Sequence, residues 1–135
     1  MKIEEVLGDR RRFLDLLLLG DEQESMIDAY LDRGDMFALY DGGLKSICVV
    51  TREGDGICEL KNIATYEECQ GQGYGRRLVE YIFEHYRGRC RVMLVGTGDS
   101  PRILRFYERC GFTVSHRIEG FFLDHYDHPV LDCSE

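Results

Sequence analysis

A run of alternating glycines, followed at once by two arginines, constrains this chain more than any other feature. Glycine occupies every second position of the run, which reads Gln70-Gly71-Gln72-Gly73-Tyr74-Gly75. An extended pattern over 57–66 precedes it and a helical pattern over 74–87 follows, so we predict a strand, a loop and a helix. Glycines let backbone N–H groups converge, and a first helical turn leaves its N–H groups unpaired. The run therefore predicts a site for a phosphate or pyrophosphate.

Arg76 supports this interpretation because it falls in the first turn of the expected helix. A cation at that position opposes the helix dipole unless an anion lies there. Other readings remain open. A dinucleotide-binding motif would need a third glycine where Arg76 stands, and a P-loop would need Gly-Lys-Ser or Gly-Lys-Thr. A plain glycine turn between strand and helix is the structural alternative.

Composition indicates a globular chain with no membrane or nucleic-acid partner. The 135 residues suit a single domain over 1–135, and the apolar fraction of 44% is ordinary for such a protein. Apolar runs such as 16–19 are too short to span a membrane, and the acidic N-terminus lacks a signal-peptide core. A net charge of -8 argues against nucleic acid. We expect a cytoplasmic protein.

The six cysteines are widely scattered and form no C-x-x-C pair. We expect reduced thiols that mostly fill the core. His125, His128 and Cys133 lie near one another in sequence, but their spacing matches no common zinc site. No metal is expected.

Hydrophobic periodicity predicts the element order β-α-α-β-β-β-α-β-α-β. The expected strands cover 3–6, 36–40, 44–51, 57–66, 91–95 and 113–119. The expected helices cover 9–19, 23–32, 74–87 and 101–110, the last with Ser100 as N-cap and Pro101 as its first residue. The tail over 120–135 stays unassigned.

A second motif follows the strand over 91–95. It contains Tyr107, Gly111 and Phe112, in the pattern Y-x-x-x-G-F, while Gln70, Gly73 and Gly75 match Q/R-x-x-G-x-G/A. With both motifs at this spacing, the stretch over 36–112 resembles the GNAT family of N-acetyltransferases. The resemblance implies an α/β (α+β) fold with a mixed, mostly antiparallel central sheet. Helices flank this sheet, which is splayed between its fourth and fifth strands.

The resemblance also implies acetyl-coenzyme A as co-substrate, in a cleft between the splayed strands. Backbone groups of Ile63, Ala64 and Thr65 would bind the pantetheine arm. Asp99 or Ser100 stands where the family often has an asparagine facing pantetheine. The pyrophosphate would be held by the glycine run and the arginine after it: Gln70, Gly71, Gln72, Gly73, Tyr74, Gly75 and Arg76.

The implied reaction is direct attack of an amine on the thioester. By resemblance, Tyr107 is the general acid that protonates the leaving thiolate, whereas spacing alone also fits a core aromatic. Glu59 is the candidate base, because burial in a central strand would raise its pKa. A solvent-facing Glu59 paired with Lys61 is the alternative.

The acceptor is expected to be a primary amine of a small molecule or a peptide. Only 129–133 is available as a further strand beside the fifth, so the sheet edge is short, open or completed by another subunit in a homodimer. Two other functions remain open at this point. One is a non-catalytic acyl-coenzyme A-binding or regulatory module, and the other is a dinucleotide-binding domain.

Overall fold

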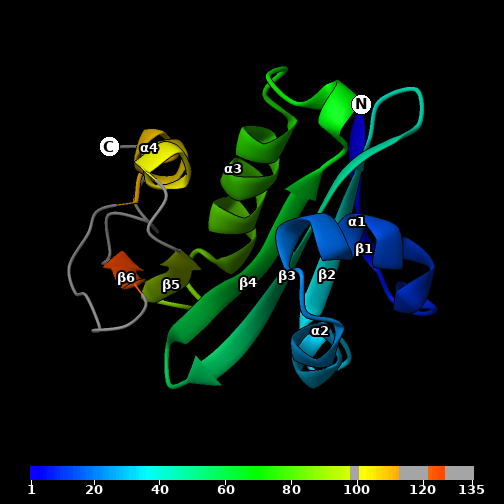
Figure 1. The fold of residues 1–135 in the computed structure, drawn as a ribbon. Coiled ribbons are helices and arrows are strands. Elements are labelled where there is room, and N and C mark those ends of the chain that lie inside the picture. Colours follow the sequence, from blue (N-terminus) through cyan, green and yellow to red (C-terminus); the bar gives the residue numbers. More distant parts are fainter. Residues whose placement is uncertain (98–100, 113–121, 127–135) are drawn as a thin grey trace. The chain divides into compact units, whose positions relative to one another are not determined.

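The computed structural model describes residues 1–97, 101–112 and 122–126, and it is an α/β fold with the expected order of helices and strands (Figure 1). Hydrogen bonding orders the strands β1-β2-β3-β4-β5-β6 in one sheet. The β1–β2, β2–β3 and β5–β6 pairs are antiparallel and the β4–β5 pair is parallel, so the sheet is mixed. The elements are β1 (Lys2–Val6), η1 (Arg10–Phe13), α1 (Leu14–Gly20), α2 (Glu24–Tyr30), β2 (Asp35–Tyr40), β3 (Leu44–Gly54), β4 (Ile57–Thr65), η2 (Glu67–Cys69), α3 (Tyr74–Tyr86), β5 (Val92–Thr97), α4 (Pro101–Arg109) and β6 (Phe122–Tyr126).

The chain divides into two compact units, and the first comprises residues 1–51 and 61–78. It holds β1, β2, most of β3, the second half of β4 and the start of α3. The turn between β2 and β3 is tight, because Gly42 and Gly43 both have positive φ, of 70° and 145°. Its core is apolar and is formed by Val6, Phe13, Leu16, Leu17, Ile27, Tyr30, Leu31, Met36, Ala38, Ile47, Val49 and Ala64.

A buried amide connects β4 to both N-terminal helices within this first unit. Asn62 is 3% exposed, and its Nδ2 donates hydrogen bonds to the Leu17 carbonyl at 2.9 Å and the Tyr30 hydroxyl at 3.0 Å. The Tyr30 hydroxyl in turn donates to Asp21 at 3.1 Å. Gly20 allows the close approach, since a Cβ there would lie 2.1 Å from Asn62 Oδ1. The second half of β4 is thereby fixed against α1 and α2.

The second unit comprises residues 52–60 and the described part of 79–135. The first half of β4 pairs with β5 from Ile57↔Val92 to Leu60↔Val95, and β6 pairs with the other edge of β5. Aromatic rings pack between α3 and the end of α4, with the Phe83 and Phe112 centroids 5.3 Å apart. Only the first four of the nine residues of β4 lie in the parallel ladder, which agrees with a sheet that splays at this point.

The observed strands correct one expectation about the C-terminal edge of the sheet. The strand beside β5 is Phe122–Tyr126, not 129–133, and it pairs with β5 antiparallel. The expected strand over 113–119 lies outside the described residues.

One pair of cysteines contradicts the expectation of reduced thiols throughout. Cys58 and Cys90 form a disulfide, with Cα atoms 6.3 Å apart. The backbone N–H groups of Arg91 and Val92 both donate to the Gly56 carbonyl, at 2.8 and 3.1 Å, and this contact brings the segment after α3 alongside β4. Three other cysteines are buried and free, as expected of core residues: Cys48, Cys69 and Cys110.

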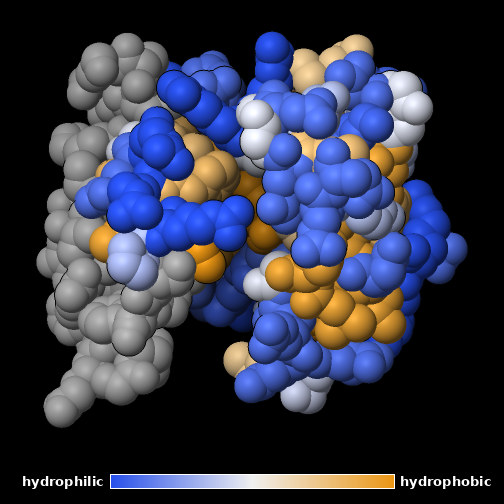
Figure 2. Space-filling model, turned by 45° about the horizontal axis from the view of Figure 1, so that its top comes forward, coloured by the Kyte–Doolittle hydropathy of each residue, from blue (hydrophilic) through white to orange (hydrophobic). Residues whose placement is uncertain are grey.

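Figure 2 shows that hydrophilic side chains cover most of the face it draws, with smaller apolar areas between them. The large exposed apolar side chains among the described residues are Met1, Leu7, Leu19, Met26 and Ile103. Within 1–97, 101–112 and 122–126, no helix has both the length and the apolar character needed to cross a membrane.

Candidate functional site

The glycine run forms a loop between β4 and α3, as predicted. Gly71 and Gly73 have positive φ, of 82° and 87°. A Cβ on either glycine would meet no protein atom within 4 Å, so both positions border open space. The helix that follows has 13 residues, with no acidic residue in its first turn. Unpaired N–H groups, the helix dipole and open space beside the loop together fit a bound phosphate.

Two side chains of the run anchor the loop to the rest of the first unit. Gln70 Nε2 donates to the Thr65 carbonyl at 3.1 Å, at the end of β4. The Tyr74 hydroxyl donates to Asp41 Oδ2 at 2.7 Å, in the turn between β2 and β3. The hydrogen bond to Asp41 raises the pKa of Tyr74 and keeps its hydroxyl protonated. In this structure the Gln70 and Tyr74 side chains thus hold the loop in place.

Side-chain hydrogen bonds hold the end of β4, where the resemblance places the contacts to pantetheine. The Ala64 carbonyl already accepts a hydrogen bond from Ser46 Oγ at 2.8 Å, and the Thr65 carbonyl accepts the one from Gln70. Ser46 Oγ also lies 2.9 Å from Thr65 Oγ1. Ile63 and Thr65 are half-buried while Ala64 is buried. These bonds fix the strand end that leads into the glycine loop.

Tyr107 lies in the second unit, on α4, and is 7% exposed. Its ring packs edge-on against Phe106 at 5.2 Å and Phe112 at 5.4 Å, measured between centroids. Its carbonyl accepts from the Phe112 N–H at 3.0 Å, which closes the C-terminal turn of the helix. The phenol ring is therefore held in one orientation, as both the general-acid and the core interpretations require.

Glu59 lies in the first half of β4, also in the second unit, and is half-buried between Cys58 and Leu60, which are buried. Its register partner in β5 is Leu94. The first unit thus holds every described residue expected to bind the cofactor, from Ile63 to Arg76, and the second unit holds Glu59 and Tyr107. Asp99 and Ser100 lie outside the described residues.

Sequence reasoning missed the residues that support the loop. Asp41 falls between two predicted strands, 36–40 and 44–51, and Ser46 falls within the second. No local pattern marks either one, because their partners Tyr74 and Ala64 lie 33 and 18 positions away. The pairing of Cys58 with Cys90 was missed for the same reason, across 32 positions.

Comparison with known proteins gives matches at the level of family and of fold. The acetyltransferase (GNAT) domain family matches residues 32–114. An uncharacterised N-acetyltransferase of Bacillus subtilis, YvbK, is 33% identical over 121 residues, which cover 87% of this chain and 78% of that protein. A Bacillus subtilis acetyltransferase solved in complex with coenzyme A is 30% identical, with a TM-score of 0.78 over 85% of this chain and 78% of that chain.

A GNAT family acetyltransferase from Elizabethkingia anophelis, solved with acetyl-coenzyme A bound, shares the fold. Its TM-score is 0.82 at 24% identity, over 93% of this chain and 97% of that chain.

Proposed function

The chain belongs to the GNAT acetyltransferase family, and from this premise we propose that it transfers the acetyl group of acetyl-coenzyme A to a primary amine of a small molecule or a peptide. The glycine loop carries the proposal. Gly71 and Gly73 leave open space beside backbone N–H groups at the start of a long helix, and this arrangement suits a pyrophosphate.

The co-substrate is supported independently by relatives. The Bacillus subtilis acetyltransferase was solved with coenzyme A, and the Elizabethkingia anophelis enzyme with acetyl-coenzyme A. In this chain the backbone from Gln70 to Arg76 would hold the pyrophosphate, and Ile63, Ala64 and Thr65 would offer backbone groups to the pantetheine arm. Asp99 and Ser100 complete the set of cofactor-binding residues that we propose. When bound, acetyl-coenzyme A supplies the activated thioester.

We propose a single direct displacement. The neutral amine attacks the thioester carbonyl carbon, a C–N bond forms, the C–S bond breaks and the amine loses a proton. Glu59 accepts that proton, directly or through water, and its half-buried position in β4 suits a carboxylate with restricted solvation. Tyr107 donates a proton to the leaving thiolate, for which its fixed ring on α4 is suited.

The remaining assignments concern the whole chain. We propose that residues 1–135 act as one N-acetyltransferase domain, because β4 and α3 each run without a break from one compact unit into the other. We place the protein in the cytoplasm, where metabolism supplies acetyl-coenzyme A. The amine acceptor is the partner we expect, with a homodimer as the proposed assembly and no nucleic-acid partner.

The test combines binding with turnover. The protein is incubated with acetyl-coenzyme A and a panel of small primary amines and peptides, and the acetylated products are identified by mass spectrometry. Calorimetry compares coenzyme A with NAD. We expect micromolar or tighter binding of coenzyme A and acetylation of at least one class of amine. Binding without any acetylated product would support a regulatory acyl-coenzyme A-binding module. Preference for NAD would overturn the assignment.

A further inference from the structure

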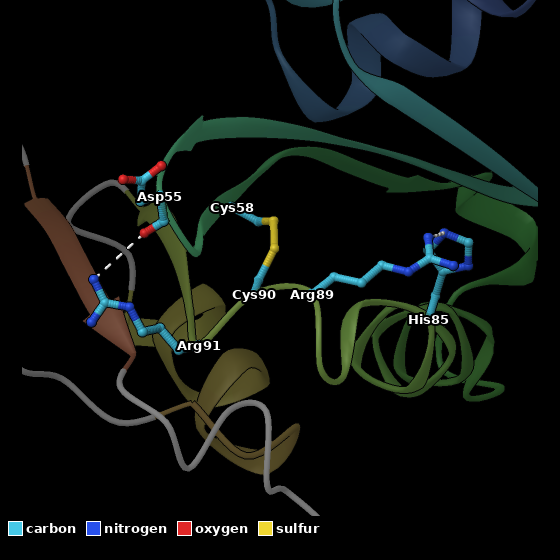
Figure 3. The surroundings of a disulfide bond; sticks show 6 residues. All are labelled: Asp55, Cys58, His85, Arg89, Cys90 and Arg91. Atoms are coloured by element: carbon cyan, nitrogen blue, oxygen red, sulfur yellow. Dashed lines mark hydrogen bonds between the residues drawn. A yellow bond between two sulfur atoms is a disulfide. The ribbon is translucent and has the colours of Figure 1, made fainter.

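The disulfide between Cys58 and Cys90 (Figure 3) joins a completely buried residue to one that is 7% exposed. Cys58 belongs to β4, and Cys90 follows α3. From the relation of these residues to their neighbours, we propose that the bond is an exchange site, at which an anionic low-molecular-weight thiol adds to Cys90 and releases Cys58. The argument rests on burial, on local charge and on the chemistry of thiol–disulfide exchange.

Burial selects the sulfur that is attacked. Cys58 is completely buried, whereas Cys90 is 7% exposed and stands among exposed residues, namely Gly88, Arg89 and Arg91. Exchange requires a thiolate to reach a disulfide sulfur, so its rate depends on access to that sulfur. Cys90 is therefore the sulfur that receives the incoming thiol, and Cys58 is the leaving group.

Local charge selects the kind of thiol. Arg89 Nη1 lies 3.4 Å from the His85 ring nitrogen, and Arg91 Nη2 lies 3.5 Å from the Asp55 carbonyl. Figure 3 shows the two arginine side chains directed to opposite sides of the disulfide. Both arginines are exposed and flank Cys90 directly in the sequence, so they place positive charge on either side of it. Asp55 contributes one opposing charge, and Arg87 forms an ion pair with Glu84 at 2.7 Å.

The chemical step balances without any added oxidant. The sulfur of the incoming thiolate bonds to Cys90 Sγ, the Cys58–Cys90 bond breaks, and Cys58 leaves as a thiolate that takes a proton from water. One thiol is consumed and one is formed. Glutathione-like peptides and coenzyme A share the required chemistry, since each couples a thiol to negative charge. Only the coenzyme A source depends on the proposed function, because acetyl transfer would release it.

The experiment maps the adduct. The full-length protein is oxidised and exposed to glutathione, coenzyme A or the cationic thiol cysteamine. The reaction is then trapped with iodoacetamide, and peptides are analysed by mass spectrometry. We expect the thiol on Cys90 and the alkyl group on Cys58. Each rate is divided by the rate of the same thiol with a neutral small disulfide, which removes differences in intrinsic reactivity. At low salt the anionic thiols should then react at least about threefold faster than cysteamine, and high salt should shrink that ratio.

Matched variants separate local charge from net charge. Arg89→Gln/Arg91→Gln should remove the preference for anionic thiols, while Arg12→Gln/Arg33→Gln, with the same change in net charge, should retain it. Cys110→Ser, which replaces a buried free thiol, should leave the adduct pattern unchanged. Alkylation of both Cys58 and Cys90 in oxidised, denatured protein would overturn the proposal, as would an adduct on Cys58. If coenzyme A reacts and glutathione does not, coenzyme A is the thiol that this site takes.

Discussion

Tyr107 shows how one residue can serve packing and chemistry through different atoms. Its ring packs against those of Phe106 on α4 and Phe112 beyond the end of α4, and these ring contacts involve carbon atoms alone. The hydroxyl is the part that a general acid needs. A substitution that removes only the hydroxyl therefore separates the two roles.

We predict that Tyr107→Phe lowers turnover by roughly a hundredfold or more, with little change in acetyl-coenzyme A affinity. The ring stays, so the melting temperature should remain near that of the wild type. Steady-state kinetics, calorimetry and thermal unfolding measure the three quantities. Tyr81→Phe, which removes a half-buried hydroxyl on α3, is the matched control and should keep full turnover. Turnover within a few-fold of wild type in Tyr107→Phe would leave the residue with a packing role only.

The substitution Glu59→Gln tests the residue that we propose as the general base. The amide preserves the shape of the side chain but cannot accept a proton. Turnover should fall most at pH values where the wild-type carboxylate is ionised, and the acidic limb of the pH–rate profile should disappear. Glu80→Gln, at an exposed position on α3, is the control and should keep the profile of the wild type. If the acidic limb survives in Glu59→Gln, another group is responsible for it.

Single residues also show which features could be predicted from the sequence and which could not. The glycines at 71 and 73 could be read directly, because a positive φ is a local requirement that glycine meets best. The Cys58–Cys90 bond could not be predicted from the sequence, since it depends on where β4 and β5 pair. Asn62 likewise looked like one more strand residue, and only the packing of α1 and α2 gives it partners.

At the scale of elements, the glycine loop and the first turn of α3 act together. Gly73 and Gly88 provide a matched pair, because they have φ of 87° and 83° and a Cβ on either would meet no protein atom within 4 Å. Alanine at either position brings a similar backbone strain. Only Gly73 lies in the proposed pyrophosphate site.

We therefore predict that Gly73→Ala weakens coenzyme A binding at least about tenfold, or ~1.4 kcal/mol, while Gly88→Ala changes it less than twofold. Calorimetry on the two folded variants measures this difference. Equal effects would mean that strain alone is responsible, and that the loop does not approach the phosphates.

The Tyr30 network predicts how the N-terminal helices respond to alkali. Burial raises the pKa of Tyr30 above its ordinary value of 10.0, and the charge of Asp21 adds to the shift. The folded state thus favours the protonated phenol more than the unfolded state does. This contribution to stability is complete below about pH 10 and is lost as the pH rises above that value.

We predict that the free energy of unfolding falls between pH 10 and 11.5 by up to about 1.4 kcal/mol per pH unit for this group. Tyr30→Phe should be less stable at pH 7, because it loses the hydrogen bonds to Asn62 and Asp21, yet it should fall less steeply in alkali. Urea denaturation at several pH values gives both slopes. Identical slopes would show that Tyr30 does not control the alkaline limit.

The type and order of the helices and strands could be predicted from the sequence, whereas the residues at which they begin and end could not. Apolar periodicity placed α3 and β4 correctly to within a residue. The helix expected over 9–19 instead begins as a short 3-10 turn at Arg10–Phe13, where Asp9 adopts positive φ. β3 runs on to Gly54 because its exposed end needs no apolar pattern to continue. The strand at Phe122–Tyr126 was unassigned, since β5 alone provides the edge that it needs.

At the scale of the whole molecule, three covalent paths connect the two compact units. β3 passes between them at Thr51, β4 at Leu60 and α3 at Leu78. The Cys58–Cys90 bond closes a loop of the chain, and the crossings at Leu60 and Leu78 lie within that loop. That closed segment contains the glycine loop and all of α3. The disulfide thus restricts the unfolded chain across both units at once.

Reduction of this bond should lower the free energy of unfolding by about 3–4 kcal/mol, because closing a loop of this length removes unfolded-state entropy. Urea denaturation of oxidised and reduced protein, followed by far-UV circular dichroism, measures the difference. The oxidised protein should also show a smaller m-value, since its unfolded chain stays more compact. Cys58→Ala/Cys90→Ala provides the control, and reductant should not change its stability. If oxidised and reduced wild-type protein unfold at the same urea concentration with the same m-value, the bond does not constrain the unfolded molecule.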